Sequence, residues 1–367
     1  MIEFGVFWIL IVLSAVYVVF HSFLWRGINR LFHPKFTGSE HWLSVIVAAR
    51  NEEQNIGALL ESLVQQEYPA DHFEIIVTND RSTDATASIV SSFQQKYPNI
   101  RLINIRENAS DMPHKKNALS AAIALARNDI LVCTDADCIA PTRWLQTVSE
   151  YFTDDVGIVA GYSPYHNGQA GSFLRYEELK NSVIAAAAVG AGVPFMCTGR
   201  NFAYRMQVFH EVGGFEKIKH SISGDDDLFL QLVSKETKWN IRYITSSDCA
   251  VRTSPPETLS QFIRQRTRHV SASAHYPFLV QTGYAFVHLF HLSIFIGYFF
   301  SPITALIALM IKFMTDGAMI AAGIKLFREE VSVAEFFLDE VLLVLYSFFI
   351  APLGFVRTFT WKGSSSR

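Results

Sequence analysis

Residues 130–138 read ILVCTDADC, an apolar run that passes directly into two acidic side chains. The residues from Leu131 to Thr134 are apolar or small, which is typical of a buried strand. Asp135 and Asp137 follow at once, two positions apart. Two interpretations are open at this point. The acids either form a metal and sugar site at the end of a strand, or they belong to a solvated turn before a helix that starts at Pro141.

The neighbouring segments alternate between strand-like and helix-like patterns. Residues 43–49, LSVIVAA, are a continuous apolar run, as expected for a strand that is covered on both faces. Leucines after this run recur at helical spacing. We expect strands at 43–49, 74–78, 100–105 and 130–134, and helices at 56–64, 84–97 and 115–126. This order predicts an α/β fold, a Rossmann-like, mostly parallel sheet with helices on both faces.

Polar side chains follow three of the predicted strands directly. They are residues 50–52 (RNE), residues 79–80 (ND), and the pair Asp135 and Asp137. Ligands of parallel sheets bind outside the carboxyl ends of the strands, so we expect these groups to share one crevice. No glycine-rich phosphate loop follows any strand, and a diphosphate would then need a cation. Asp137 and Asp135 are therefore predicted to bind Mg²⁺ or Mn²⁺, which prefer oxygen ligands.

Two later motifs add charged groups. Residues 224–230 read GDDDLFL, and these acids either stabilise a helix N-terminus or include a general base whose pKa its neighbours raise. Residues 265–269 read QRTRH on a predicted helix. Gln265 and Arg268 lie on one face of that helix, and an arginine fork suits a phosphate. A basic helix at the membrane surface is the alternative.

The composition points to a membrane protein with a large polar part. Of 367 residues, 50% are hydrophobic and 18% are charged, and the mean hydropathy is +0.20. Residues 4–25 carry no charge and are long enough for one membrane-spanning helix. They lack the basic start of a signal peptide. The uncharged residues 277–311 predict a hairpin near Ser301 or one span with an interfacial lead-in, and residues 336–356 predict a further span.

Basic residues predict the orientation. Arg26 and Arg30 follow the first span and place the chain beyond it in the cytoplasm, and Arg357 and Lys362 favour a cytoplasmic C-terminus. We expect two or four crossings in total. The predicted domains are a transmembrane anchor at 1–30, a cytoplasmic α/β domain at 40–275, transmembrane or interfacial helices at 277–357, and a cytoplasmic tail at 358–367.

The net charge argues against a nucleic-acid-binding protein, and the cysteine content argues against a disulfide-bonded one. The net charge of −3 provides no basic field, so we expect no nucleic-acid partner. The four cysteines lie in the part that we place in the reducing cytosol, and they are expected to be buried and free of disulfides.

In their order along the chain these motifs resemble the membrane-associated, inverting family 2 glycosyltransferases with the A-type nucleotide-sugar-binding fold. The resemblance runs from about residue 43 to 270. It departs from the family at Asn79, where Asp is common, and at His269, where Trp is frequent. The matching segments are VIVAARNEEQNI (45–56), TNDRSTDAT (78–86), HKKNALSAAI (114–123), TDADC (134–138), TGRNFAYRMQVFHEVGGF (198–215), SGDDDLFL (223–230) and QRTRH (265–269).

The resemblance implies a role for each matching residue. Asp135 would hold the ribose or the donor sugar, and Asp137 would ligate the metal. The general base would be Asp225 if the alignment is anchored on Leu228, or Asp226 if it is anchored on Gly224, and we favour Asp225. The implied nucleotide-sugar-binding residues are Ala48, Glu52, Asp80, Lys115, Asp135, Gln265 and Arg268.

The implied function is that of a metal-dependent, inverting glycosyltransferase of the hexosyltransferase type. Its donor would be a nucleotide diphosphate sugar, with UDP-sugars the commonest in the resembled group, and its acceptor a lipid or glycan. The protein would contact membrane lipids as an integral protein of the plasma (inner) membrane, with its catalytic domain in the cytoplasm. The alternatives are a processive polysaccharide synthase, which His269 disfavours, and a catalytically inactive membrane scaffold.

Overall fold

The computed structural model describes residues 1–34, 40–107, 111–166, 168–349, 360–361 and 364–365. The chain packs as two compact units. The helical unit comprises residues 1–31, 171–193 and 260–357, and the sheet unit comprises residues 32–170, 194–259 and 358–367.

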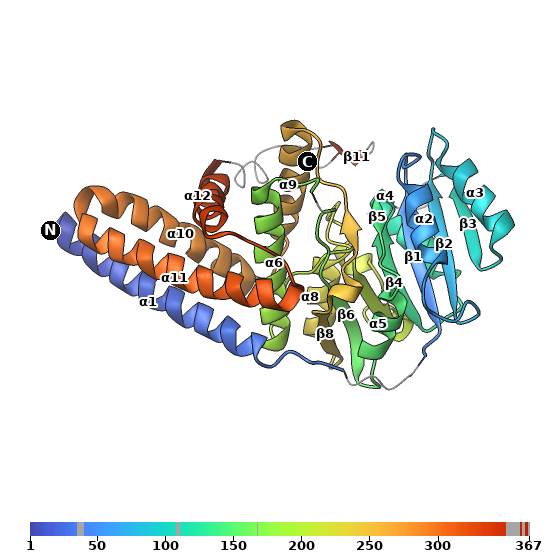
Figure 1. The fold of residues 1–367 in the computed structure, drawn as a ribbon, viewed down its shortest axis with the longest axis horizontal. Helices are drawn as coiled ribbons and strands as arrows, with labels where there is room; N and C mark the ends of the chain where they lie inside the picture. The colour runs from blue at the N-terminus through green and yellow to red at the C-terminus, as the bar shows by residue number, and fades with distance from the viewer. Residues whose placement is uncertain (35–39, 108–110, 167, 350–359, 362–363, 366–367) are drawn as a thin grey trace. The chain divides into compact units, whose positions relative to one another are not determined.

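The sheet unit is built on a seven-stranded sheet with the order β3-β2-β1-β4-β7-β6-β8 (Figure 1). Strands β1 to β4 pair in parallel, whereas β7 runs antiparallel to both β4 and β6, and β8 is parallel to β6. The predicted mostly parallel sheet is therefore confirmed, with β7 as the reversed strand. The strands are β1 (Leu43–Ala49), β2 (Phe73–Asp80), β3 (Ile100–Ile105), β4 (Ile130–Asp135), β6 (Val156–Gly161), β7 (Phe202–Arg205) and β8 (Asn240–Ile244).

Helices connect these strands and supply the core. Leu59 and Leu63 of one such helix are fully buried against Val45 and Val47 of β1 in a single apolar cluster. The continuous apolar strand pattern follows from this, because burial on both faces removes the need for polar alternation. The helices are α2 (Ile56–Val64), α3 (Thr86–Lys96), α4 (His114–Ile123), α5 (Trp144–Tyr151), α7 (Met206–Glu211) and α8 (Asp227–Glu236), with 3₁₀ turns η1 (Glu216–Ile218) and η2 (Ser247–Cys249).

A short ladder corrects one local prediction. Strand β5 (Cys138–Ile139) pairs antiparallel with β9 (Arg252–Thr253) directly after the two acids. The next helix, α5, therefore begins at Trp144 rather than at Pro141. A second ladder joins β10 (Thr360–Trp361) and β11 (Ser364–Ser365).

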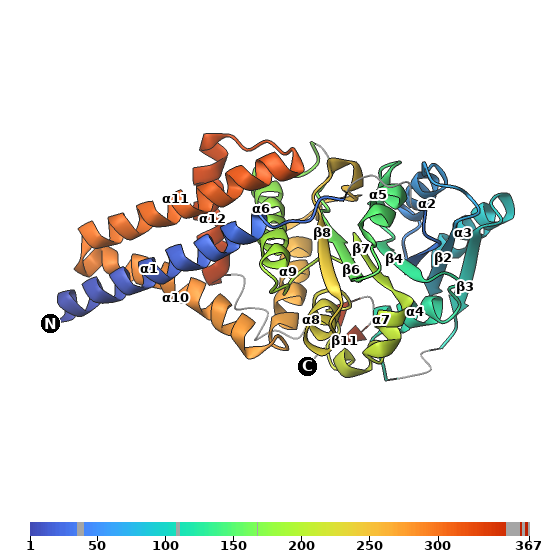
Figure 2. The ribbon, with the colours of Figure 1, turned by 90° about the horizontal axis from the view of Figure 1, so that it is seen from below.

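The helical unit contains the apolar segments. Among the described residues, α1, α10 and α11 are long and apolar enough to cross a membrane, and they run side by side (Figures 1 and 2). Helix α10 ends at Phe300 and α11 begins at Pro302, so of the two predicted alternatives the structure has the hairpin near Ser301. The helices are α1 (Ile2–Ile28), α6 (Ser172–Gly190), α9 (Leu259–Ser273), α10 (Phe278–Phe300), α11 (Pro302–Phe327) and α12 (Val333–Phe349).

The predicted number of crossings needs correction. A chain that begins outside a membrane and ends inside crosses it an odd number of times, so two or four crossings do not fit the predicted termini. The three candidate spans of the described chain do fit them. Residues 350–356 of the last predicted span, Arg357 and most of the predicted tail lie outside the described residues.

Helix α6 belongs to the helical unit although it lies between β6 and β7 in the chain. It packs closely on α1, because a Cβ at Gly27 would lie 1.9 Å from the carbonyl oxygen of Ala187, and one at Gly190 would lie 2.0 Å from that of Gly27. Glycine is thus required at this contact. The division into domains along the chain remains a prediction.

A buried polar network joins four elements of this unit. The Nζ atoms of Lys312 and Lys180 lie 2.8 and 3.1 Å from Asp316 Oδ2, and both lysines also pair with Glu340. Tyr17 donates a hydrogen bond of 2.7 Å to Asp316. These residues come from α1, α6, α11 and α12. The two lysines balance the two carboxylates, so the network has no net charge to leave unpaired in an apolar surrounding.

Candidate active site

The polar strand ends meet at one edge of the sheet. Asp80 is the last residue of β2 and Asp135 the last of β4. In the parallel register, Ala48 of β1 lies between Thr78 of β2 and Asp135 of β4. These strand ends therefore lie at one edge of the sheet, the edge at which parallel sheets bind ligands, and the shared crevice stays a prediction.

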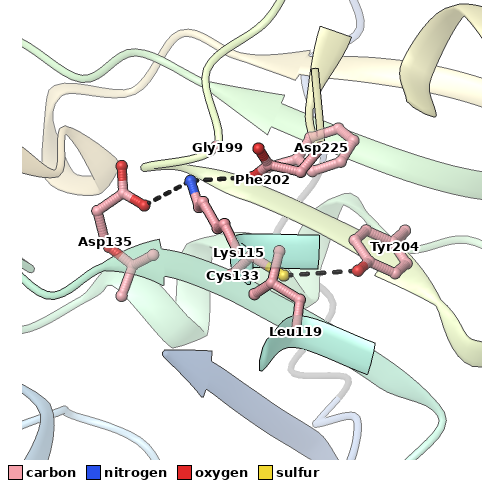
Figure 3. Close-up of a pocket in the computed structure, with 9 residues that line it drawn as sticks. Lys115, Leu119, Cys133, Asp135, Gly199, Phe202, Tyr204 and Asp225 are labelled. Atoms are coloured by element: carbon pink, nitrogen blue, oxygen red, sulfur yellow. Dashed lines mark hydrogen bonds and ion pairs between the residues drawn. The ribbon is translucent and has the colours of Figure 1, made fainter. Parts of the chain in front are cut away.

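Lys115 joins two acids that are far apart in the sequence (Figure 3). Its Nζ lies 2.9 Å from Asp135 Oδ1 and 2.9 Å from Asp225 Oδ2. Burial lowers the pKa of Lys115, but Asp135 and Asp225 outweigh it and hold the pKa above its usual range. The pocket around these groups is lined by Lys115, Leu119, Cys133, Thr134, Asp135, Gly199, Phe202, Tyr204 and Asp225.

The two candidate bases have different partners. Asp225 contributes a carboxylate to the pocket and pairs with Lys115. Asp226 instead accepts backbone hydrogen bonds of 2.8 Å from Gly199 and 2.8 Å from Asp227, as the N-cap of α8. Burial and the adjacent Asp225 raise the pKa of Asp226. Asp226 therefore anchors the loop around Gly199, and Asp225 is the acid that faces the pocket.

The carboxylates of Asp135 and Glu52 lie near that of Asp137. Burial, followed by Asp135 and Glu52, raises the pKa of Asp137, while Arg200 lowers it. Partly buried acids that repel one another fit a bound cation, which would favour their ionised forms. No group of three or more ligating side chains with metal-site geometry occurs in the described part of the chain. Mg²⁺ is commonly held by one or two carboxylates together with substrate phosphates, so a site with two protein carboxylates would be sufficient, and Asp135 and Asp137 as its ligands stay a prediction.

Asp80 lies beside two arginines, of which only Arg50 belongs to the strand-end groups expected from the sequence. Its carboxylate is 2.9 Å from the guanidinium of Arg81 and 3.6 Å from that of Arg50. Arg81 in turn donates to Nδ1 of His114 at 2.5 Å. Burial, followed by Arg81 and Arg50, lowers the pKa of His114. The only signal in the sequence is the position of both arginines directly after strands.

Two loops at this edge are tied to each other. Ser82 accepts from the backbone N–H of Asn51 at 3.0 Å, and the Asn51 side chain accepts from the backbone N–H of Thr83 at 2.9 Å. The backbone N–H of Glu52 donates to Thr86 at 2.8 Å. Asn51 and Arg81 have left-handed backbone angles of φ 53° and 54°. Such turns stand at strand ends where the chain must change direction sharply.

Asn201, the last residue of the segment GRN (199–201), is buried in the core. Asn201 is 2% exposed and donates to the carbonyl oxygens of Tyr162 and Cys249 at 2.9 and 2.7 Å. It also accepts from the indole N–H of Trp144 at 3.0 Å. Asn201 therefore joins three segments that are far apart in the chain, which the sequence pattern did not predict.

Gln265 and Arg268 lie on α9 in the helical unit. Arg266, between them, is buried and pairs with Glu177 of α6, so it faces away from its two neighbours as its spacing predicts. The Oε1 atom of Gln265 is buried and has no hydrogen-bond partner among the described residues. The roles of Gln265 and Arg268, and those of Ala48 and Glu52 at the end of β1, stay predictions.

Two family models match the chain. The model of glycosyl transferase family 2 matches residues 44–213, and the model of glycosyl transferase family group 2 matches residues 130–356. The second match covers more than half of the 367 residues.

Known proteins with similar sequences and folds are glycosyltransferases. The probable glycosyltransferase YdaM of Bacillus subtilis is 27% identical over 281 residues, which cover 71% of this chain and 64% of the relative. Beta-monoglucosyldiacylglycerol synthase of Synechocystis is 35% identical over 108 residues, which cover 29% of this chain and 22% of the relative. The chain thus spans less than two thirds of either relative.

One solved structure shares the fold over nearly the whole chain. It is the mannosyltransferase PcManGT from Pyrobaculum calidifontis in complex with GDP-Man and Mn²⁺. The alignment has a TM-score of 0.58 at 20% identity and covers 94% of this chain and 99% of that chain. At this sequence identity, the likeness shows that the two chains share a fold and shows nothing further.

Proposed function

The chain belongs to glycosyl transferase family group 2, and we propose that it transfers a sugar, with inversion, from a nucleotide diphosphate sugar to a lipid or glycolipid at a membrane. The observation that carries the proposal is the site at the sheet edge. Lys115 lies 2.9 Å from both Asp135 and Asp225, and Asp137 lies in the same group of acids. A donor-binding acid and a separate acid for the acceptor are what a direct displacement requires.

In the proposed reaction Asp225 is the general base. The acceptor oxygen attacks the anomeric carbon as its proton passes to the Asp225 carboxylate, and the carbon–oxygen bond to the diphosphate breaks. The electron pair leaves with the nucleoside diphosphate. Because attack and departure take place on opposite faces of the carbon, the anomeric configuration inverts. Lys115 pairs with both Asp135 and Asp225 and so holds donor and acceptor groups in one place.

Asp135 and Asp137 fit as the protein ligands of a divalent cation, as their repulsion in a partly buried position indicates. A bound Mg²⁺ or Mn²⁺ would stabilise the negative charge of the departing diphosphate. We propose that Gln265 and Arg268 add hydrogen bonds to the same phosphates. At the other end of the donor, Ala48, Glu52 and Asp80 are proposed to contact the base and ribose, with Asp80 held by Arg50 and Arg81.

The acceptor is proposed to be membrane-bound. Three helices of the described chain can span a membrane by length and composition. The relative from Synechocystis is named for the synthesis of a glucosyldiacylglycerol, a lipid product. We place the catalytic domain on the cytoplasmic side of the plasma membrane, where nucleotide sugars are made. The donor nucleotide is proposed to be uridine, and guanosine is the other base to test, given the GDP-Man of the structural neighbour.

The proposal is tested with purified full-length protein. UDP- and GDP-sugars are each incubated with membrane lipid extract and Mn²⁺ or Mg²⁺, and products are identified by mass spectrometry. We expect one donor to give a lipid product that is absent with chelator or with D225N. The matched control is D154N, which changes an exposed acid outside the site and leaves turnover unchanged.

Three results would count against the proposal. An intact protein that neither binds nor hydrolyses any nucleotide sugar would indicate an inactive scaffold. A ladder of lengthening products would indicate a processive synthase. Turnover that persists in full with chelator present would exclude the role of the cation.

A further inference from the structure

Lys116 is a fully buried lysine next to the site, and neither the motifs nor the reaction uses it. It follows Lys115 in α4, and its side chain has no exposed surface. Its Nζ donates to the carbonyl oxygens of Ile218, Ser221 and Ser223 at 3.0, 2.5 and 2.7 Å. An ammonium group has three hydrogens, and all three are used by these contacts.

The three acceptors lie on the segment that leads into the catalytic acids. Ser223 is followed by Gly224 and then by Asp225. Gly224 has φ +83°, and a Cβ there would lie 2.5 Å from a methyl group of Leu228. The turn therefore requires glycine, and it leaves few alternative paths for the chain between Ser223 and Asp225. The contacts that hold the carbonyl groups of residues 218–223 therefore also fix the position of Asp225.

Lys116 has no ion-pair partner that would explain its burial otherwise. Within the described ranges, no carboxylate lies at salt-bridge distance from its Nζ, and its three hydrogen bonds are all to backbone carbonyl oxygens. An apolar side chain would fill the same space without the cost of desolvating a charge. Burial lowers the pKa of Lys116 to about 8, although Asp225, Asp226 and Asp227 raise it. The reason to bury a lysine here is therefore its three hydrogen bonds to the backbone.

We propose that Lys116 is a positioning residue for the transfer reaction. By gathering the carbonyls of residues 218–223, it fixes the direction from which Asp225 enters the site, while Asp226 fixes the other side as the cap of α8. The two neighbouring lysines of α4 thus have different roles. Lys115 contacts the Asp225 carboxylate itself, and Lys116 holds the main chain that leads into Asp225. The inference rests on the proposed function for its kinetic part only.

The test compares K116M, K116R and K219M. K116M removes the three donors at nearly constant volume, and K116R restores donors. K219M is the matched control, because Lys219 lies on the same segment but is 37% exposed and pairs with Asp111 and Glu216. Amide hydrogen exchange of peptides covering residues 216–228 reports the order of the segment. Nucleotide-sugar affinity and kcat report the site.

We expect K116M to exchange faster in this segment and to lose about 10²-fold in kcat, because a displaced base is no longer aligned. Donor affinity should stay close to that of the wild type, since Asp225 acts on the acceptor. K116R should recover part of both losses, and K219M should resemble the wild type. If K116M does not fold, K116Q, which keeps two donors, takes its place.

Unchanged exchange in K116M would overturn the proposal, and so would faster exchange with an unchanged kcat. An equal loss of donor affinity and kcat would also overturn it, since a general defect of the fold behaves in that way. If the wild type transfers no sugar at all, the proposed function fails. The exchange measurement then still decides whether Lys116 orders residues 218–223.

Discussion

At the scale of single residues, Asp225 and Asp226 show how neighbours in a chain acquire different roles. Asp225 has Lys115 at 2.9 Å within the pocket, whereas Asp226 accepts from two backbone amides. An acid whose oxygens both accept from fixed N–H groups is poorly placed to take a proton from a substrate. These contacts are the reason that we propose Asp225 rather than Asp226 as the base.

Substitution should separate the two acids. D225N is expected to lower kcat by about 10²–10⁴-fold, because the base is lost. Thermal stability should change little, because the amide oxygen still accepts from Lys115 and Asp135 remains the ionic partner of that lysine. D226A should lower the stability by about 1 kcal/mol, because it removes the cap of α8. Steady-state kinetics and thermal unfolding distinguish these outcomes. A D226A protein that is stable but inactive, beside an active D225N, would assign the base to Asp226.

His114 gives a prediction for acid pH. Burial and the two nearby arginines lower its pKa, so the folded protein binds a proton on His114 less readily than the unfolded chain does. Stability is therefore retained above the ordinary histidine pKa of about 6.5 and declines as the pH falls below it. H114N keeps an acceptor for Arg81 but cannot be protonated. Between pH 7 and pH 5 it should lose less thermal stability than the wild type, and an identical pH profile would refute this.

At the scale of elements, strands that are buried on both faces can be predicted from the sequence, whereas short strands and long-range contacts of helices cannot. The first four strands could be predicted closely, because a strand buried on both faces is a continuous apolar run. Residues 43–49 and 100–105 were predicted with the bounds that β1 and β3 have. Strand β7 and the small β5–β9 ladder could not, since short strands are defined by their partners. Helix α6 likewise gives no sign in its sequence that Lys180 pairs with Asp316 of α11.

The network in the helical unit makes a testable claim about these helices. K312M should destabilise the protein by about 3–5 kcal/mol, because it leaves two buried carboxylates, Asp316 and Glu340, with Lys180 as their one remaining lysine partner and thus one negative charge uncompensated. K312M/E340Q should be less destabilised than the sum of the single changes, since Lys180 and Asp316 still balance each other. K325M, on the exposed part of α11, is the control. Unfolding in detergent measures each variant, and additive effects would contradict the coupling.

At the scale of the whole molecule, the sequence of apolar segments sets a topology that can be checked. The basic residues Arg26 and Arg30 at the end of α1 predict that this end of the helix lies inside. If α1, α10 and α11 each cross, the turn at Ser301 lies outside and Arg328 lies inside. The predicted family and α/β fold are confirmed by the family models and the fold comparison.

Labelling of single introduced cysteines tests this topology. S301C should react with a membrane-impermeant maleimide in intact cells, and R328C only after permeabilisation. The four native cysteines should stay unlabelled in intact cells, because they lie in the part that we place in the cytoplasm. The opposite pattern would place the site outside, where nucleotide sugars are scarce, and would argue against the proposed donor.

The sequence alone determined the strand–helix alternation, the acids at the strand ends and the apolar spans. Each of these depends on contacts between near neighbours or on burial along one continuous segment, and such features leave a local pattern. Only the tertiary structure decided that Lys115 bridges Asp135 and Asp225, that Lys116 holds residues 218–223, and that α6 packs with the apolar helices. These pairs join residues that are far apart in the chain. Their partners are chosen by how the whole chain packs, and no local spacing records that choice.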